Sequence, residues 1–390
     1  MNFLKNKMQD FALPLLLAMA LLMPTLNVAT VLYVLPTLAI LLYFIFNDRP
    51  AFASFFLLAK KYWVIACWAL FALSSMMWSP YPQYVLDSWV SAFLIPVLSL
   101  MAFFLLASKL SQEFLIRSFY LVVVIFSTLS IVAFFVFDGR VSHYSMFFGT
   151  MGYYSSYILI AFVCLVPFLT KSTRVPYYFL LLLCFFFSTQ RIVWVLFPFI
   201  FVADFIFVNK KLDIKFVFLF AVVVFLSYLF LKYYQDSRPA NAFVSHEKPK
   251  NIIAYLLANE RLYLWGEWFR RGMENWFVGA GFGRKASLYY FSHGGYWPRQ
   301  NLNHAHNMFL STFVQLGLVG LVLQVASYWQ LIGGVVKKNS KFSFACIVLV
   351  LIFAMRHLTD DPEHKRVLMF YCGFVGVLMG AMYQKKSDFN

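Results

Sequence analysis

The side chains best suited to chemistry stand where a polar interval meets an apolar run. In the stretch NLNHAHNMFL, His304, His306 and Asn307 occupy the start of a predicted helix. Asn301 or Asn303 could cap that helix, which would place the other three residues in its first turn. A helix start is electropositive, so it disfavours a charged imidazole and attracts phosphate. We therefore expect a neutral histidine that can accept a proton beside an anion site; the alternative is that these residues only mark the water boundary.

The spacing of candidate metal ligands argues against a metal centre. Two histidines two positions apart on a helix diverge by about 200°, so they cannot easily share one ion. All five cysteines lie in predicted membrane spans, with no spacing typical of a metal site or a disulfide framework: Cys67, Cys164, Cys184, Cys346 and Cys372. We expect neither a metal nor a cofactor.

Two arginines stand where a charge is costly or unexpected. Arg191 follows the stretch FFFSTQ at the junction of two predicted spans, and ionisable groups at membrane depth are usually functional. The stretch NIIAYLLANERLYLWGEWFRRGMENW reads as an amphipathic helix. One face of it carries Arg261, Trp265, Trp268 and Gly272. The alternatives are a simple boundary residue for Arg191 and, for the stretch, an interfacial helix lying on the membrane.

Two further polar segments follow the amphipathic stretch. The sequence GAGFGR ends at Arg284; its glycines could present backbone N–H groups to phosphate. It lacks the strand and helix of a dinucleotide site, so a tight turn is the favoured interpretation. The segment RHLTDDPEHKR contains Asp360 and Asp361, which are possible acidic contributors to a site or members of a solvated loop.

The elements that must position these residues are membrane helices. The chain has 390 residues, of which 62% are hydrophobic and 12% are charged, whereas soluble domains carry about twice that charged fraction. Apolar runs near the length of a bilayer span recur throughout. We predict an all-α polytopic membrane protein with about twelve spans: 12–28, 30–46, 62–77, 88–107, 116–137, 151–170, 175–190, 192–208, 214–232, 305–330, 342–357 and 366–384.

Charge predicts the orientation of these spans. Lysines and arginines gather in the short loops on the side of the N-terminus, and the opposite loops near 28–30 and 78–87 have none. Both termini are therefore expected in the cytoplasm. The formal net charge of +16 is mostly this topological signal, so nucleic-acid binding is not expected. The first span resembles a signal peptide with AMA at 18–20, but a second span follows at once, so we expect an uncleaved first span.

The predicted topology divides the chain into three parts. Residues 1–232 hold nine spans, residues 233–303 form one large outer loop with amphipathic helices, and residues 304–390 hold three spans. All seven histidines fall on the outer side, where histidine could transfer protons near neutral pH. No cytoplasmic loop is long enough for a nucleotide site. Because ATP and nucleotide sugars are unavailable outside, the substrate must bring its own activated bond.

Together these pieces resemble the O-antigen ligase and O-antigen polymerase superfamily of bacterial surface-polysaccharide enzymes. The resemblance covers the whole topology, and its specific part runs from Glu260 to Phe309, with ERLYLWGEWFRRGMENWFVGAGFGR and the HAHN run that opens the next helix. Arg191 matches the arginine that the family carries at the outer end of a mid-chain span, although STQ departs from the usual serine-rich form. The TDDPEH loop matches a place where ligases often carry an acidic residue.

The resemblance implies a GT-C-like glycosyltransferase of the bacterial inner membrane with a periplasmic site. Its donor would be O-antigen on undecaprenyl pyrophosphate, and the ligase, which transfers it to lipid A–core, is favoured because the first eight spans have only short connections. An O-antigen polymerase and a protein O-oligosaccharyltransferase are the family alternatives. A lipid-linked oligosaccharide flippase is the alternative from another class, but the unusual polar residues all lie on one side.

The residues support a metal-independent, inverting transfer. The leaving pyrophosphate gains negative charge, which Arg191 and Arg261 could clamp with paired hydrogen bonds, with Arg284 as a weaker third candidate. His306 is the best candidate for the general base, while His304 and Asn307 could orient it or contact phosphate. The remaining expected substrate contacts are aromatic, from Trp265 and Trp268, which would border the lipid tail or stack on sugars.

Overall fold

The computed structural model describes residues 14–26, 30–136, 148–188, 190–205, 260–284, 305–360 and 365–384, with isolated positions at 222, 225 and 229. Every regular element in these ranges is a helix. The main ones are α2 Thr30–Asn47, α3 Arg49–Lys61, α4 Trp63–Ser74, α5 Pro82–Trp89, α6 Ile95–Ala107, α7 Gln112–Val136, α9 Met151–Val163, α10 Lys171–Ser188, α11 Arg191–Asp204, α14 Glu260–Glu274, α16 Met308–Val336, α17 Lys341–Arg356 and α18 Lys365–Met382.

The described helices overlap most of the ranges predicted as spans. By length and hydropathy, four described helices could cross a membrane, at Pro82–Ala107, Gln112–Val136, Met308–Val336 and Lys365–Met382, or up to five if the bent pair Val31–Asn47 and Arg49–Lys61 is one span. Shorter apolar helices cover Pro14–Thr25, Trp63–Met77, Gly152–Phe168 and Ile192–Asp204. This is the all-helical pattern of a multi-pass membrane protein. The count of twelve stays a prediction, since fewer described helices meet these criteria and only positions 222, 225 and 229 of the ninth predicted span, 214–232, are described.

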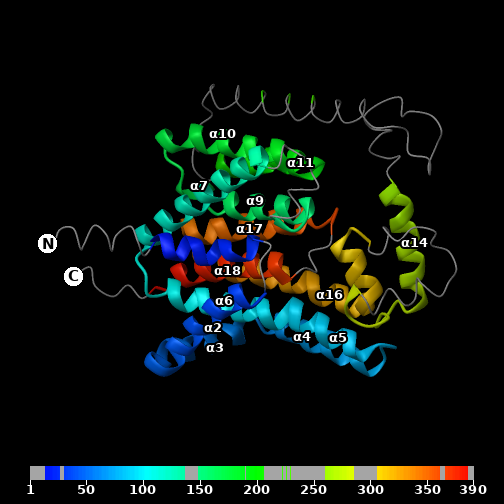
Figure 1. Ribbon diagram of the computed structural model, residues 1–390. Helices are drawn as coiled ribbons and strands as arrows, with labels where there is room; N and C mark the ends of the chain where they lie inside the picture. Colours follow the sequence, from blue (N-terminus) through cyan, green and yellow to red (C-terminus); the bar gives the residue numbers. More distant parts are fainter. Residues whose placement is uncertain are drawn as a thin grey trace.

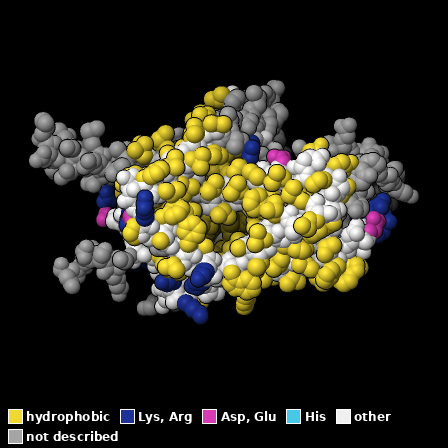
Figure 2. Space-filling view, turned by 90° about the horizontal axis from the view of Figure 1, so that it is seen from below, with side chains coloured by type: hydrophobic (Ala, Val, Ile, Leu, Met, Phe, Trp, Pro, Cys, Tyr) yellow, Lys and Arg dark blue, Asp and Glu magenta, His cyan; other side chains and the backbone are white. Residues whose placement is uncertain are grey.

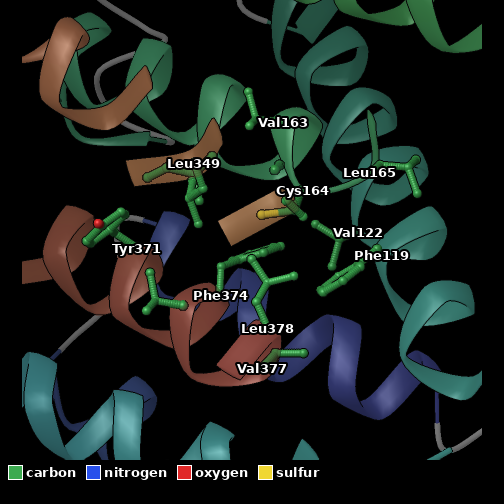
Figure 3. Close-up of a cluster of buried hydrophobic side chains, with 14 of the residues drawn as sticks. Phe119, Val122, Val163, Cys164, Leu165, Leu349, Tyr371, Phe374, Val377 and Leu378 are labelled. Carbon is green, nitrogen blue, oxygen red and sulfur yellow. The ribbon is translucent and has the colours of Figure 1, made fainter. Parts of the chain in front are cut away.

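Helix α18 is the centre of the bundle, with α17 and α9 on one side and α6 on the other (Figure 1). Its contact with α6 is close because glycines face that helix: a Cβ on Gly376 would lie 2.4 Å from the carbonyl oxygen of Leu100. Small residues let membrane helices approach to backbone distance. On another side of α18, the ring of Phe374 stacks on Phe119 with centroids 5.6 Å apart, among the buried side chains around Cys164 (Figure 3).

Among the described residues, one side of this bundle is mostly apolar. The surface seen from below is largely hydrophobic across its middle, with lysine, arginine and acidic side chains mostly toward its left-hand part, its right-hand end and its upper edge (Figure 2). Large apolar side chains on it are exposed, including Phe46 at 73% and Leu57 at 72%. An apolar belt between charged ends matches the hydrocarbon layer of a bilayer. Helix α14 lies at the right-hand end of the molecule and α3 toward the left-hand end (Figure 1); we call the α14 end the outer end and the other the inner end.

An inner-end helix was missed by the span prediction. The sequence around Arg49 and Lys60 reads as a basic loop, yet residues Arg49–Lys61 form α3, which is bent by 113° from the helix before it. The Asp48 side chain caps α3 by accepting from the N–H of Ala51 and pairs with Lys109 at 2.6 Å. A short helix with exposed apolar and basic side chains is typical of a membrane interface.

A buried ion pair, which the sequence analysis also missed, joins α10 to α11 at the inner end. Asp204 is fully buried; its Oδ2 lies 3.0 Å from Arg174 Nε and accepts the hydroxyl of Tyr178 at 3.0 Å. The pair fixes the two helices side by side. The far end of α11, which begins at Arg191, is thereby directed to the outer end.

Helix α16 is not the straight span that the run 305–330 predicts. It begins at Met308, and Gly317 interrupts it with φ 64° and ψ −164°. The rings of Phe309 and Tyr328 lie 6.4 Å apart between centroids, whereas a straight helix would separate these positions by about 28 Å. The two arms of α16 therefore form a V with its vertex at Gly317.

Candidate functional site

The short arm of α16 begins with a complete backbone cap. Asn307 is the N-cap, and its Oδ1 accepts the N–H groups of Phe309 and Leu310 at 3.0 and 3.1 Å. The N–H of Met308 donates to the carbonyl oxygen of His357 at 2.9 Å. Asn307, not Asn301 or Asn303, therefore starts the helix, which corrects the expectation that it lies in the first turn. The amides that would attract phosphate at this helix start already have protein partners.

His306 lies just before the cap, in an unusual backbone conformation. Its φ is 50°, in the left-handed region of backbone conformation that residues other than glycine rarely adopt. The imidazole is about one-quarter exposed, and its Nδ1 lies 3.6 Å from Oδ1 of Asp360. A histidine held by a carboxylate at one ring nitrogen presents the other nitrogen in a fixed direction. The structure thus brings together two residues that the sequence analysis proposed separately.

Asp360 is itself held by a buried arginine. Arg356 is 2% exposed, and its Nη2 donates to Asp360 Oδ2 at 2.7 Å. The same guanidinium donates to Ser155 Oγ from Nε at 3.1 Å and from Nη2 at 2.8 Å, and to the carbonyl oxygen of Gly152 at 3.0 Å. These contacts join the outer ends of α9 and α17. A Cβ on Gly152 would lie 2.7 Å from Asp360 Oδ2, so the network requires glycine there.

Electrostatics keep Asp360 ionised. Its burial raises the pKa, but the charge of Arg356, the nearby His306 and the hydrogen bond from Arg356 outweigh burial, so the pKa of Asp360 lies well below its ordinary range. In the adjoining connection, burial and then the charge of Arg356 lower the pKa of His357 to about 3. An anionic carboxylate therefore faces His306, while the neighbouring His357 stays neutral.

The predicted aromatic face of α14 packs on the short arm of α16. The indole Nε1 of Trp265 donates to the carbonyl oxygen of Ala305 at 2.8 Å, directly before His306. Trp268 is 1% exposed and belongs to a buried cluster with Leu264, Ala305 and Val314. The ring of Trp268 is packed inside the protein here, and its role toward a lipid tail or a sugar stays a prediction. For Trp265 the substrate role stays a prediction, and its hydrogen bond positions the HAHN run.

The glycine-rich turn occupies the vertex of the V. The N–H groups of Ala280 and Gly281 donate to the carbonyl oxygens of Val314 and Gln315 at 3.0 and 2.9 Å. The Gly283 N–H donates to Gln315 Oε1 at 2.8 Å. Beyond Gly317, the N–H groups of the long arm at 318 and 319 donate to carbonyl oxygens at 276 and 277. The turn therefore satisfies the backbone groups that the broken helix releases.

This arrangement decides between the two interpretations of GAGFGR. Gly279, Gly281 and Gly283 all have positive φ. The N–H of Gly279 donates to Asn275 at 2.8 Å and that of Phe282 to Ser75 Oγ at 2.9 Å. Since every amide from 279 to 283 donates within the protein, the phosphate-binding alternative is wrong and the tight turn is confirmed. Arg284, at the end of the turn, is half-buried.

The arginines proposed as a clamp are placed only in part. Arg191 is the first residue of α11, and Arg261 lies in the first turn of α14; their side chains are outside the described part. Helical spacing puts Arg261 on the face that carries Trp265. His304 and Asp361 also lie outside the described residues. Their roles stay predictions.

The described part of the site can hold and move a proton. His306 supplies a nitrogen, Asp360 fixes the ring, and Arg356 fixes Asp360. Among the described residues, no three His, Cys, Asp or Glu side chains form a group that could hold a metal ion. Sequence reasoning missed Arg356 and Ser155. The only available signal was an arginine four residues before an aspartate at a predicted helix end, the spacing of a helical ion pair.

A comparison with protein families matches part of the chain. A family model described as O-antigen ligase matches residues 176–325. The matched range contains Arg191, α14, the glycine turn and His306, while Arg356 and Asp360 follow it. No curated protein matches the chain significantly.

Proposed function

Residues 176–325 match the model of the O-antigen ligase family, and from this premise we propose a function. We propose that the protein transfers a glycan from undecaprenyl pyrophosphate to a sugar hydroxyl of lipid A–core. Members of this superfamily are ligases or polymerases that act on lipid-linked glycans. The single observation that carries an enzymatic role here is the pairing of His306 with Asp360 at 3.6 Å. A carboxylate that orients a histidine is the arrangement of a general base.

The proposed reaction moves one proton and one glycosyl group. The acceptor hydroxyl loses its proton to Nε2 of His306 while its oxygen bonds to the anomeric carbon. The bond from that carbon to the pyrophosphate oxygen breaks, and the electron pair leaves with the pyrophosphate. Asp360 holds Nδ1 of the ring throughout, so the proton is received at Nε2. A direct displacement of this kind inverts the anomeric centre.

The leaving pyrophosphate requires positive charge, which we assign to Arg191 and Arg261. A guanidinium can bind a phosphate through two parallel hydrogen bonds and stabilises charge that develops in the transition state. Arg191 begins α11 and Arg261 is the second residue of α14, and the starts of both helices lie toward the outer end (Figure 1). Arg284 and His304 are further candidates for contact with the donor, and Asp361 for the acidic loop. With this charge supplied by the protein, the reaction needs no metal.

The proposed location is the bacterial inner membrane, with both termini cytoplasmic and the site periplasmic. Gly266 of α14 suits a topology test because a Cβ there meets nothing within 4 Å; Ser172 is an exposed position at the inner end. In a variant lacking the native cysteines, Gly266→Cys should react with an impermeant thiol reagent added to spheroplasts, and Ser172→Cys only after lysis. The reverse pattern would exclude a periplasmic site.

A purified-protein assay tests the function itself. The protein, an undecaprenyl-pyrophosphate glycan and lipid A–core are combined without ATP and with a chelator, and the covalent product is resolved by mass. We expect transfer that requires both substrates. A flippase would give no covalent product under these conditions.

The O-antigen polymerase is the alternative within the family. Its product would be a longer glycan that is still linked to undecaprenyl pyrophosphate, and it would form without lipid A–core. A deletion strain separates the two cases: loss of all O-chain from the core indicates a ligase, whereas a single repeat unit on the core indicates a polymerase. A protein O-oligosaccharyltransferase would require a protein acceptor in the same assay.

A further inference from the structure

The inner end of α16 meets the junction of α3 and α4 through polar contacts. The ammonium group of Lys61 donates to the carbonyl oxygen of Gly334 at 3.0 Å. On the next turn, Gln330 Oε1 accepts the N–H of Val64 at 3.1 Å. A Cβ on Gly334 would lie 2.5 Å from the hydroxyl oxygen of Tyr62. The end of α3 is therefore fixed against the last turns of α16.

This contact concentrates positive charge. Lys337 and Lys338 follow Gly334 at i+3 and i+4, so they lie on the helix face that Lys61 approaches. Burial, followed by the charges of Lys338 and Lys337, lowers the pKa of Lys61. Lys60 precedes Lys61 and is exposed. Like charges held this close repel one another unless an anion lies between them.

The part of the chain that the structure describes supplies no such anion. No carboxylate there pairs with the four lysines 60, 61, 337 and 338. Two acidic residues of the same end have other partners: Asp48 pairs with Lys109 at 2.6 Å and Asp204 with Arg174 at 3.0 Å. Lys338 lies instead over the ring of Tyr383, 4.3 Å from its centroid. We call Lys60, Lys61, Lys337 and Lys338 the inner lysine cluster.

The cluster lies beside surface that suits lipid. Phe56 and Leu57 of α3 are 55% and 72% exposed, and Trp63 at the start of α4 is 59% exposed. Trp329 of α16 is 77% exposed, and a Cβ on Gly333 would meet nothing within 4 Å. Exposed tryptophans beside lysines are typical of the depth at which headgroups meet acyl chains. Apolar side chains thus border the cluster on α3, α4 and α16.

We propose that the inner lysine cluster binds the phosphate headgroup of an anionic phospholipid, whose acyl chains lie along Trp63 and Trp329. The repulsion among the lysines is the reason for selectivity, because a zwitterionic headgroup brings no net charge to relieve it. Juxtamembrane basic residues gain about 1 kcal/mol each from an anionic lipid surface. The site lies at the inner end, away from His306, and does not depend on the proposed function.

Native mass spectrometry of the delipidated full chain tests this proposal. The protein in detergent receives equal amounts of phosphatidylglycerol and phosphatidylcholine, and bound lipid is counted. We expect preferential retention of phosphatidylglycerol. The triple variant Lys61→Gln, Lys337→Gln and Lys338→Gln should bind it at least tenfold more weakly. The variant with arginine at the same three positions should retain binding, which separates charge from folding.

The matched control removes the same charge elsewhere on the inner end. Lys109→Gln, Arg117→Gln and Lys171→Gln together should leave phosphatidylglycerol binding within about twofold. Equal losses in the two triple variants would overturn the proposal, because binding would then reflect net charge alone. Competition by millimolar inorganic phosphate to the same extent as by lipid would also overturn it, since the site would then be a soluble-anion site. Equal retention of phosphatidylglycerol and phosphatidylcholine by the unaltered protein would likewise overturn the proposal.

Discussion

The Nδ1 atom of His306 lies 3.6 Å from Oδ1 of Asp360, although one residue precedes α16 and the other follows α17. Arg356 holds the carboxylate from its other oxygen at 2.7 Å. If Asp360 orients the ring for proton transfer, Asp360→Asn should lower the turnover number strongly while donor binding changes little. Turnover per folded molecule in the purified assay measures this. Near-normal turnover of Asp360→Asn would remove the orienting role.

His306 and Asn307 should separate chemistry from stability. His306→Ala should reduce transfer about 10²–10⁴-fold, the usual cost of losing a general base, with little change in thermal stability. Asn307→Ala removes the cap and should destabilise the protein by about 0.5–2 kcal/mol. Asn307→Asp keeps a capping oxygen and should retain most of the stability. If His306→Ala loses stability but its folded fraction transfers normally, His306 is a structural residue.

The stability of the protein should fall in mild acid because of His357. Its pKa in the folded protein is about 3, against about 6.5 when unfolded. Below pH 6.5 the unfolded chain therefore binds a proton at His357 that the folded protein does not bind. The free energy of unfolding falls by up to about 1.4 kcal/mol per pH unit from pH 6.5 down toward pH 3. Asp360 has a lowered pKa in the folded protein, so its own contribution to stability is lost only below about pH 3.9. Melting temperatures in detergent from pH 8 to pH 4.5 should show a slope that is shallower for His357→Gln. An unchanged slope would contradict this account.

The glycine turn should tolerate no side chain at Gly279. This residue has φ 74°, and a Cβ would lie 2.3 Å from the backbone of Gln315. Gly279→Ala should cost at least about 1–2 kcal/mol from the left-handed backbone alone, together with the displacement of α16. Gly266 is the control, because it is helical with open space around it; Gly266→Ala should be neutral or gain up to about 1 kcal/mol. Similar melting temperatures for the two variants would mean that the turn does not support the V of α16.

Arg261 should need the planar geometry of arginine. Arg261→Lys keeps the charge and loses the paired hydrogen bonds to phosphate, so we expect lower turnover and weaker donor binding. Arg270→Lys is the control on the same helix, since Arg270 forms an exposed pair with Glu267 at 2.7 Å, and such pairs contribute little. Normal transfer by Arg261→Lys would exclude the clamp at that position.

Hydrophobic periodicity and the distribution of charge were sufficient to predict many of the helices of this fold. Apolar runs with few charges predict helices, and α7 and α18 lie close to the predicted ranges. The aromatic face of the stretch around Trp265 and Gly272 predicts the side of α14 that packs on another element, because helical spacing alone sets which residues share a face. The local motifs were also sufficient to identify His306 and the acidic loop as candidate site residues.

The tertiary structure alone decided how these candidates meet. The apolar run 305–330 gives no sign of a V, because the break at Gly317 is stabilised by backbone partners from the glycine turn. The same pairing explains why the amides of GAGFGR are not available to phosphate. Asn307 rather than Asn301 or Asn303 starts α16, a choice made by the carbonyl oxygen of His357, which accepts from Met308. Hydrogen bonds between segments distant in sequence have no local signature, so the sequence determined which residues are present at the site and only the fold determined which of them touch.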